Sequence, residues 1–201
     1  MKKTIVFDLG GVLIDWNPRY LYREIFNDDD KMDHFLANIC TGHWNELQDA
    51  GRSLLEATDI LVKHFPEHQE YIKLFYGQWS KMLNGSIEGS VKILRSLKAQ
   101  GYRLLALTNW SHETFPFALE IFDFLHFFES ILVSGVEKLI KPDPAIFNLL
   151  IKRYSLDPAE SIFIDDNIKN VAASRAVGLD GIHFTSPQTL QYQLGERGIK
   201  V

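Results

Sequence analysis

Short apolar runs recur along this 201-residue chain, and each of them ends in polar residues. The runs show no alternation with polar positions and are rich in β-branched or bulky side chains. Such runs are typical of strands that are buried on both faces of a parallel sheet. Four strands and a fifth candidate are therefore predicted, at residues 4–7, 104–107, 131–133, 162–164 and 181–184.

Helical patterns occupy the stretches between these runs. Apolar residues at helical spacing lead up to Gly101, a second set follows Pro144, and a third runs up to Gly178. Glycine is common just past the end of a helix, and proline is favoured at the first helical position. Strands that alternate with helices imply βαβ units, so we expect an α/β fold with a doubly wound, Rossmann-like parallel sheet.

Residues 17–85 break this alternation, because they contain no strand as convincing as the first four. Their apolar spacing predicts helices at residues 19–26, 31–40, 53–64 and 70–83. The segment is rich in aromatic residues, most of which we expect to pack between these helices. We predict a core domain of residues 1–16 and 86–201, with residues 17–85 inserted as a small helical cap domain.

The composition is that of an ordinary globular protein, with 46% apolar and 23% charged residues. The net charge of −5 argues against sequence-independent nucleic-acid binding, which depends on Lys and Arg neutralising phosphates. No apolar stretch reaches the ~18 residues of a membrane span, and Asp8 interrupts the N-terminal apolar run. Cys40 is the single cysteine, which excludes an internal disulfide and favours a reducing compartment. We expect a soluble, cytoplasmic protein, monomeric by default, with no nucleic-acid or membrane partner.

Polar residues with complementary chemistry follow four of the predicted strands. In open α/β sheets, ligands bind beyond the carboxyl ends of the strands. The residues found there are, in chain order, Asp8, Thr108, Asn109, Lys141, Asp165 and Asp166. A carboxylate can attack phosphorus and form an aspartyl phosphate. Other carboxylates can hold Mg²⁺, and a hydroxyl, an amide and an ammonium can bind phosphoryl oxygens. The set thus contains the groups that phosphoryl transfer requires.

Each of these features also has a purely structural explanation. Asp8 before two glycines is compatible with a turn, and Thr108-Asn109 alone is more typical of a turn than of a site. Two adjacent carboxylates repel each other, however, which favours a cation beside Asp165 and Asp166. Turns explain each feature singly, but they explain poorly why all four features follow strands in this order.

Taken in this order, the motifs resemble the four signatures of the haloacid dehalogenase superfamily. The first is Asp8-Leu9-Gly10-Gly11-Val12, the second Thr108-Asn109, the third Lys141-Pro142 and the fourth Asp165-Asp166. The resemblance runs from residue 4 to about residue 184. It implies a phosphatase-like member whose helical cap is inserted at a hairpin flap, which residues 12–16 would supply.

The resemblance implies a nucleophile and a set of metal ligands. Asp8 would be the nucleophile and would also bind Mg²⁺. Gly10 would offer its backbone carbonyl to the metal. Asp166 would bind the metal directly, and Asp165 would act through a metal-bound water.

The resemblance also implies a phosphate-binding set. Thr108, Asn109 and Lys141 would hold the phosphoryl oxygens, and Lys141 would in addition neutralise the Asp8 carboxylate. The implied activity is Mg²⁺-dependent hydrolysis of a small phosphorylated metabolite, such as a sugar phosphate, through an aspartyl phosphate.

Gly10 departs from the pattern of most phosphatases in this superfamily. They carry an aspartate two residues after the nucleophile, which acts as general acid and base, a contribution typically worth ~10²–10⁴ in rate. Three explanations compete. The leaving group is good enough to need little protonation, another residue substitutes, or only binding has been kept. The first is favoured because the chain resembles sugar 1-phosphate phosphatases with glycine at this position. Candidate substitutes are Asp15, His43, Asp49 and His112.

Two other classes of protein combine similar residues. True dehalogenases of the superfamily attack carbon without a metal, and typically lack the acidic pair that this chain has at Asp165 and Asp166. Receiver-type signalling modules have an acidic pair that precedes the acceptor aspartate, whereas here Asp8 comes first. A dehalogenase and a catalytically weak phosphate-binding or signalling protein are therefore the alternatives to a phosphatase.

Residues 49–52 resemble the acidic-x-Gly loop by which such caps reach into the site. His43, Asn45 and Asp49, together with Trp110 after the second motif, are candidates for contact with the leaving group. The two residues after Trp110 are further candidates for lining the pocket. The cap residues are equally consistent with an ordinary helix end followed by a turn.

Overall fold

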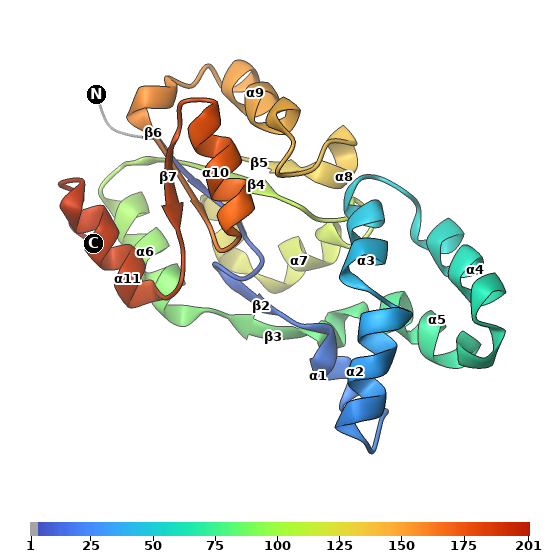
Figure 1. Ribbon diagram of the computed structural model, residues 1–201. Helices are drawn as coiled ribbons and strands as arrows, with labels where there is room; N and C mark the ends of the chain where they lie inside the picture. Colours follow the sequence, from blue (N-terminus) through green and yellow to red (C-terminus); the bar gives the residue numbers. More distant parts are fainter. Residues whose placement is uncertain (1–3) are drawn as a thin grey trace.

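Five parallel strands form the central sheet of the protein (Figure 1). The structure, a computed structural model, describes residues 4–201. The strand order is β5-β4-β1-β6-β7. The strands are β1 (Thr4–Phe7), β4 (Arg103–Thr108), β5 (Ser130–Val133), β6 (Ser161–Asp165) and β7 (Asp180–His183). Each of them coincides with or overlaps one of the five apolar runs.

Helices cover both faces of this sheet. On one face, Val6 packs in a cluster with Phe147 and Leu150 of α9 (Pro144–Arg153), and α10 (Ile168–Ala176) lies beside it. On the other face, Ile5 and Phe7 belong to a larger cluster. The helices α6 (Glu88–Ala99), α7 (Phe115–Ile121) and α11 (Pro187–Glu196) contribute to this cluster, which continues into residues 17–85. Successive residues of β1 point to opposite faces that are both buried, which explains the unbroken apolar run. The predicted doubly wound α/β fold is confirmed.

The register of the sheet brings the ends of its central strands level. Phe7 at the end of β1 pairs with Ala106 of β4 on one side and with Ile164 of β6 on the other. Because the strands are parallel, the residues that follow them emerge at the same edge of the sheet. The polar residues predicted at the strand ends therefore gather at this edge.

Residues 17–85 are mainly helical, as the sequence predicts. They form α1 (Pro18–Tyr22), α2 (Asp29–Asn38), α3 (Gly42–Asp49), α4 (Leu54–His64) and α5 (Gln69–Gly77), with short 3-10 helices η1 (Pro66–His68) and η2 (Trp79–Met82). Their aromatic side chains pack together. The ring centroids of Tyr22 and Phe35 are 5.0 Å apart, and those of Trp44 and Phe75 are 5.1 Å apart. In Figure 1 these helices lie to the right of the sheet. The division into a core and a cap at the proposed boundaries stays a prediction.

A pair of short strands joins the helical segment to the sheet; the first lies within residues 12–16, where the resemblance implies a hairpin flap, and the second is not predicted from the sequence. β2 (Ile14–Trp16) and β3 (Leu83–Ser86) pair antiparallel, so the chain enters and leaves the helical segment through one ribbon. The predicted helix at residues 70–83 is wrong at its end, because α5 stops at Gly77 and the chain continues as η2 and β3. The predicted helix at residues 19–26 is also too long, since α1 ends at Tyr22.

Three short elements complete the described chain: α8 (Ser134–Glu137), η3 (Asp123–Phe127) and η4 (Pro158–Glu160). Of these, α8 directly follows β5 and packs against α3 of the helical segment. Within residues 4–201, no helix combines the length and the apolar content that a bilayer crossing requires.

The packing between the sheet and α9 predicts a large cost for Leu150→Ala. Leu150 is fully buried beneath the sheet, so the substitution leaves a cavity and should lower the free energy of unfolding by about 2–5 kcal/mol. Urea denaturation followed by circular dichroism measures this change. Leu55→Ala is the control, because Leu55 is 73% exposed and its truncation should cost little. Equal effects of the two substitutions would contradict the assignment of this core.

Candidate active site

Asp8 lies at the centre of the edge where the strands end. Its backbone N–H donates to the carbonyl of Ile164 over 2.8 Å, which extends the pairing of β1 with β6 by one residue. Its side chain is almost completely buried. The Oδ1 atom accepts a hydrogen bond of 2.7 Å from the N–H of Leu9 and lies 2.9 Å from Nζ of Lys141. Asp8 is therefore held rigidly by main chain and by a buried cation.

The tight turn after Asp8 depends on Gly11. The N–H groups of Leu13 and Ile14 both donate to the carbonyl of Leu9, over 2.8 and 2.9 Å, and this folds the chain back on itself. Gly11 has φ +71°, and a Cβ atom added to it would lie 2.4 Å from Oδ2 of Asp166. Only glycine allows this backbone conformation and this close approach without strain. The turn thus brings the Asp166 carboxyl against the chain that follows Asp8.

Lys141 joins three strands through its ammonium group. Nζ lies 2.9 Å from Oδ1 of Asp8 and 2.7 Å from Oδ2 of Asp165, and it donates to the carbonyl of Leu107 over 3.0 Å. These contacts use all three donors of the ammonium. Asn109 positions the lysine main chain, because its side-chain amide donates to the Lys141 carbonyl and accepts from the Lys141 N–H, both over 2.9 Å.

Asp165 is fully buried and its carboxylate is saturated with donors. Besides Lys141, it accepts from Nδ2 of Asn170 over 3.0 Å and from the N–H of Asn167 over 2.8 Å. Asp166 differs, because its side chain is exposed and lines a cavity. Of the two adjacent acids, Asp165 therefore holds Lys141, and Asp166 faces the space where a ligand would lie.

Asp8, Asp165 and Asp166 form an acidic cluster suited to a divalent cation. Each offers a carboxylate oxygen, and these oxygens all lie within 4.8 Å of one another. Carboxylates are hard oxygen donors of the kind that Mg²⁺ prefers. The donor set of this chain therefore fits a divalent metal.

The electrostatics of the cluster show an excess of negative charge. Burial raises the pKa of Asp8 to about 8, with Lys141 lowering it and Asp165 and Asp166 raising it further. Burial and the charge of Asp165 also raise the pKa of Asp166. Although burial opposes the charge on Lys141, Asp8 and Asp165 raise its pKa, so it stays protonated. The single positive charge of Lys141 thus faces three carboxyl groups, and a bound cation would offset the negative charge that remains.

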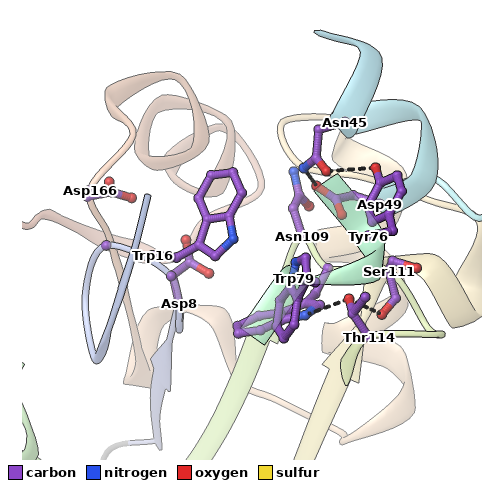
Figure 2. A pocket seen from close by; sticks show the side chains of 13 residues that line it. Asp8, Trp16, Asn45, Asp49, Tyr76, Trp79, Asn109, Ser111, Thr114 and Asp166 are labelled. Carbon is purple, nitrogen blue, oxygen red and sulfur yellow. Dashed lines mark hydrogen bonds between the residues drawn. The ribbon is translucent and has the colours of Figure 1, made fainter. Parts of the chain in front are cut away.

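A cavity of about 390 Å³ opens beside this cluster. Asp8 and Asp166 lie on one side of it and Asn45, Asp49 and Tyr76 on the other, as Figure 2 shows. The second group comes from α3 and α5, so the cavity lies between the strand ends and the helical segment.

The structure brings several of the predicted site residues to this cavity. Its lining includes Asp8, Gly10, Asn45, Asp49, Asn109, Trp110 and Asp166, and also Ser111, the first residue after Trp110. Thr108 does not line it, because β4 continues through Thr108 and the side chain is buried. His43 lies outside the cavity with its side chain 83% exposed. Asp15 and His112 also lie outside the lining, and Asp15 accepts instead from Tyr20 and Asn84.

Four cavity residues are not predicted from the sequence: Trp16, Tyr76, Trp79 and Thr114. Trp16 is the last residue of β2, and Trp79 is the first residue of η2, which leads directly into β3. The pairing of β2 with β3 therefore positions both tryptophans beside the cavity. Trp79 packs on Trp110 with ring centroids 5.5 Å apart. For Trp16, its closeness in sequence to the first motif could have indicated a place in the cavity. Tyr76 and Trp79 were instead expected to pack between helices.

Asp49 is the one of the four suggested acid substitutes that reaches the cavity. Its Oδ2 accepts from Nδ2 of Asn45 over 3.2 Å, and Oδ1 of Asn45 accepts from the hydroxyl of Tyr76 over 3.0 Å. Burial raises the pKa of Asp49 to about 7, although the N–H of Ser111 and the charge of Lys141 lower it; the charge of Glu46 raises it. Asp49 therefore changes its charge near neutral pH.

Comparison with known proteins identifies the family. A family model described as haloacid dehalogenase-like hydrolase matches residues 2–178. The chain belongs to this family of hydrolases. This confirms the resemblance of the four motifs. The chain is also similar to a sesquiterpene phosphatase of Aspergillus oryzae, which is 28% identical over 186 residues, covering 91% of this chain and 90% of that protein.

Two further relatives illustrate the range of this family. A pyrophosphatase, PpaX, of Bacillus velezensis is 28% identical over 179 residues, covering 87% of this chain and 79% of that protein. A HAD family enzyme of Bacteroides thetaiotaomicron, solved with magnesium and inorganic phosphate, matches with a TM-score of 0.67 at 20% identity, covering 92% of this chain and 96% of that chain.

The shared ammonium predicts a specific role of Lys141 in stability. Lys141→Met would leave Asp8 and Asp165 buried without a counter-charge, so we expect the free energy of unfolding to fall by about 3–5 kcal/mol at neutral pH. Urea denaturation measures the change. Lys73→Met, at an exposed position of α5, is the matched control. A loss no larger than that of the control would show that the carboxylates do not depend on Lys141.

Proposed function

We propose that this chain catalyses the Mg²⁺-dependent hydrolysis of a small phosphomonoester through an aspartyl phosphate on Asp8. The observation that carries the proposal is the buried Asp8 carboxylate, paired with Lys141 at 2.9 Å and facing a cavity that also contains Asp166. The phosphatase names of relatives support the same reaction type.

In this proposal the attacking atom is Oδ2 of Asp8. Oδ1 already accepts from Leu9 and lies nearest to Lys141, whereas within residues 4–201 Oδ2 accepts no hydrogen bond. A bond forms between Oδ2 and phosphorus as the bond from phosphorus to the leaving oxygen breaks, and that oxygen takes a proton from solvent water. Water then attacks the aspartyl phosphate at phosphorus, which releases phosphate and restores the carboxylate.

Mg²⁺ would be held by Asp8, Asp166 and the backbone carbonyl of Gly10, with Asp165 acting through a water molecule. When bound, it supplies positive charge to the phosphoryl oxygens and offsets the clustered carboxylates. The acidic cluster and the magnesium bound by the structurally similar enzyme support this part of the proposal.

Lys141 and Asn109 act on the phosphoryl end of the cavity. Lys141 favours the ionised, nucleophilic form of Asp8 against the effect of burial, and a bound Mg²⁺ would favour that form further. Asn109 lines the cavity and retains one amide hydrogen beyond its bond to Lys141, which can reach a phosphoryl oxygen. A phosphate-binding role for Thr108 stays a prediction without support from its buried position.

Gly10 limits the leaving groups that the site handles well. A Cβ atom at Gly10 would meet no atom within 4 Å, so space does not explain the absence of a side chain. The site therefore lacks the usual general acid next to the nucleophile, and we propose a substrate with a good leaving group, such as a sugar 1-phosphate. A cytoplasmic location and a monomeric state stay predictions; the buried single Cys40 agrees with a reducing environment.

The aspartyl phosphate mechanism predicts that Asp8→Asn abolishes turnover. An amide is a far weaker nucleophile than a carboxylate, so phosphate release should fall by about three orders of magnitude or more. The assay is phosphate release from sugar phosphates, an acyl phosphate, nucleotides and an aryl phosphate, each with Mg²⁺ and with chelator. Asp59→Asn, at an exposed position of α4, is the control. Activity that survives chelation would instead favour metal-free, dehalogenase-like chemistry, and silence of the wild type on all substrates would favour binding without catalysis.

Restoring an acid with Gly10→Asp should improve the hydrolysis of poor leaving groups. The open space at Gly10 accepts the side chain, so we expect kcat for an alkyl phosphate to rise by about tenfold or more relative to that for an aryl phosphate. Gly10→Asn is the matched control, because it has the same size but no acidic proton. A similar loss of activity on both substrates in both variants would mean that the backbone at Gly10 tolerates no side chain.

A further inference from the structure

The far wall of the cavity, across from Asp8, is polar but carries no positive charge. It is formed by Asn45, Asp49 and Tyr76, which we call the cap triad (Figure 2). Among the residues that line the cavity, none is a lysine, an arginine or a histidine. His43 lies outside the cavity, and the guanidinium of Arg52 is bonded to Gln48 and to the carbonyl of Trp44. Lys141 is held by carboxylates at the other end.

The cap triad is a preorganised set of hydrogen-bonding groups. Gln48 donates to the Tyr76 hydroxyl over 2.6 Å, Tyr76 donates to Asn45, and Asn45 donates to Asp49. This chain of bonds fixes the orientation of each group before a ligand binds. One Nδ2 hydrogen of Asn45 and several lone pairs of the Asp49 carboxyl remain for a ligand. Hydroxyl groups, which donate and accept at once, satisfy both.

Tryptophan rings line the cavity between the cap triad and the acidic cluster. Trp16 comes from the ribbon, Trp79 from the end of the helical segment, and Trp110 from the loop after β4. The flat apolar surface of these rings can pack against the C–H groups of a ligand. The hydroxyl groups of that ligand then lie against the cap triad. The combination matches a compact alcohol with a carbon skeleton and several hydroxyl groups.

We propose that the cap triad binds hydroxyl groups of an uncharged leaving group and excludes phosphate esters that carry a second anionic group. This inference rests on the proposed function, since it names the substrate class of the same site. A carboxylate or a second phosphate on the leaving group would be brought beside Asp49, where no lysine, arginine or histidine lines the cavity to receive it. Like charges placed side by side oppose binding strongly. The cap triad therefore repels a second anionic group as well as attracting hydroxyl groups. A wholly apolar leaving group is also disfavoured, because it would leave the second Nδ2 hydrogen of Asn45 and the free lone pairs of Asp49 without partners.

Binding of three matched ring phosphates tests this inference without depending on leaving-group reactivity. The ligands are glucose 1-phosphate, glucuronic acid 1-phosphate, which has a carboxylate in place of the hydroxymethyl group, and cyclohexyl phosphate, which has no hydroxyls. Their dissociation constants are measured by calorimetry with Mg²⁺ at pH 8, where Asp49 is mainly ionised. The protein is the Asp8→Asn variant, which holds the ligands without turnover.

Glucose 1-phosphate should bind about tenfold or more tightly than either of the other two ligands. Adding Asp49→Asn, which keeps the shape and removes the charge, should narrow the preference over glucuronic acid 1-phosphate by about tenfold. Adding Asp59→Asn instead removes a charge outside the cavity and should leave the preference unchanged. Circular dichroism establishes that each variant is folded, and the three affinities of the Asp8→Asn protein test the inference even where a second substitution fails to fold.

Equal or tighter binding of glucuronic acid 1-phosphate would overturn the exclusion of anions. Equal binding of cyclohexyl phosphate would overturn hydroxyl recognition, and an unchanged preference in the Asp49→Asn protein would overturn the role of Asp49. Failure of the wild type to release phosphate from any ester would refute the proposed function, which is a separate result. Phosphate release from small esters without detectable binding of these rings would refute the cap triad as a subsite and leave the proposed function intact.

Discussion

The buried ammonium of Lys141 is the interaction on which the rest of the site depends. It contacts Asp8 after β1, the carbonyl of Leu107 in β4, and Asp165 at the end of β6. These three groups converge only because Phe7 pairs with both Ala106 and Ile164 in a parallel register. A slip of either neighbouring strand would leave charges buried without partners, which is strongly unfavourable. Formation of the central sheet and assembly of the site are therefore one process.

The parts of the fold that follow from local pattern could be predicted. Strands buried on both faces form unbroken apolar runs, and the residues that follow parallel strands meet at one edge, so the convergence of Asp8, Lys141 and Asp166 could be predicted from the sequence. Thr108 shows the limit of this reasoning, because β4 extends one residue further than its apolar run and takes Thr108 into the sheet. The resemblance implies a hairpin flap where β2 lies, but its partner β3 was missed because it reads Leu-Asn-Gly-Ser, which has no strand pattern of its own. Its pairing with β2 is set by the tertiary fold.

The cavity wall contributed by the helical segment depends on contacts between residues far apart in sequence. The hydroxyl of Ser134 donates to the carbonyl of Asp49 over 2.6 Å and accepts from the N–H of Trp110 over 2.9 Å. The N–H of Leu54 donates to Glu113 over 2.8 Å, which fastens the start of α4 to the same region of the core. One buried serine thus links the residue that follows the second motif to the acidic residue of the helical segment. No spacing in the sequence indicates these links. Only the structure therefore shows that Asp49 lines the cavity and that His43 lies outside it.

Gly10 and Asp49 lie at opposite ends of the cavity, and in the proposed reaction one end handles the phosphoryl group and the other the leaving group. At the phosphoryl end, positioning and charge do the work, since Asp8 is held by main chain and by Lys141 and no acid stands at Gly10. At the other end, the carboxyl of Asp49 is fixed by Asn45 and lines the cavity where the proposed substrate would place its alcohol portion. A leaving group that departs readily needs no acid at Gly10. A leaving group that is hydroxylated and uncharged binds favourably beside Asp49. Both conditions describe the same kind of molecule, although they come from different segments of the chain and from different physical causes.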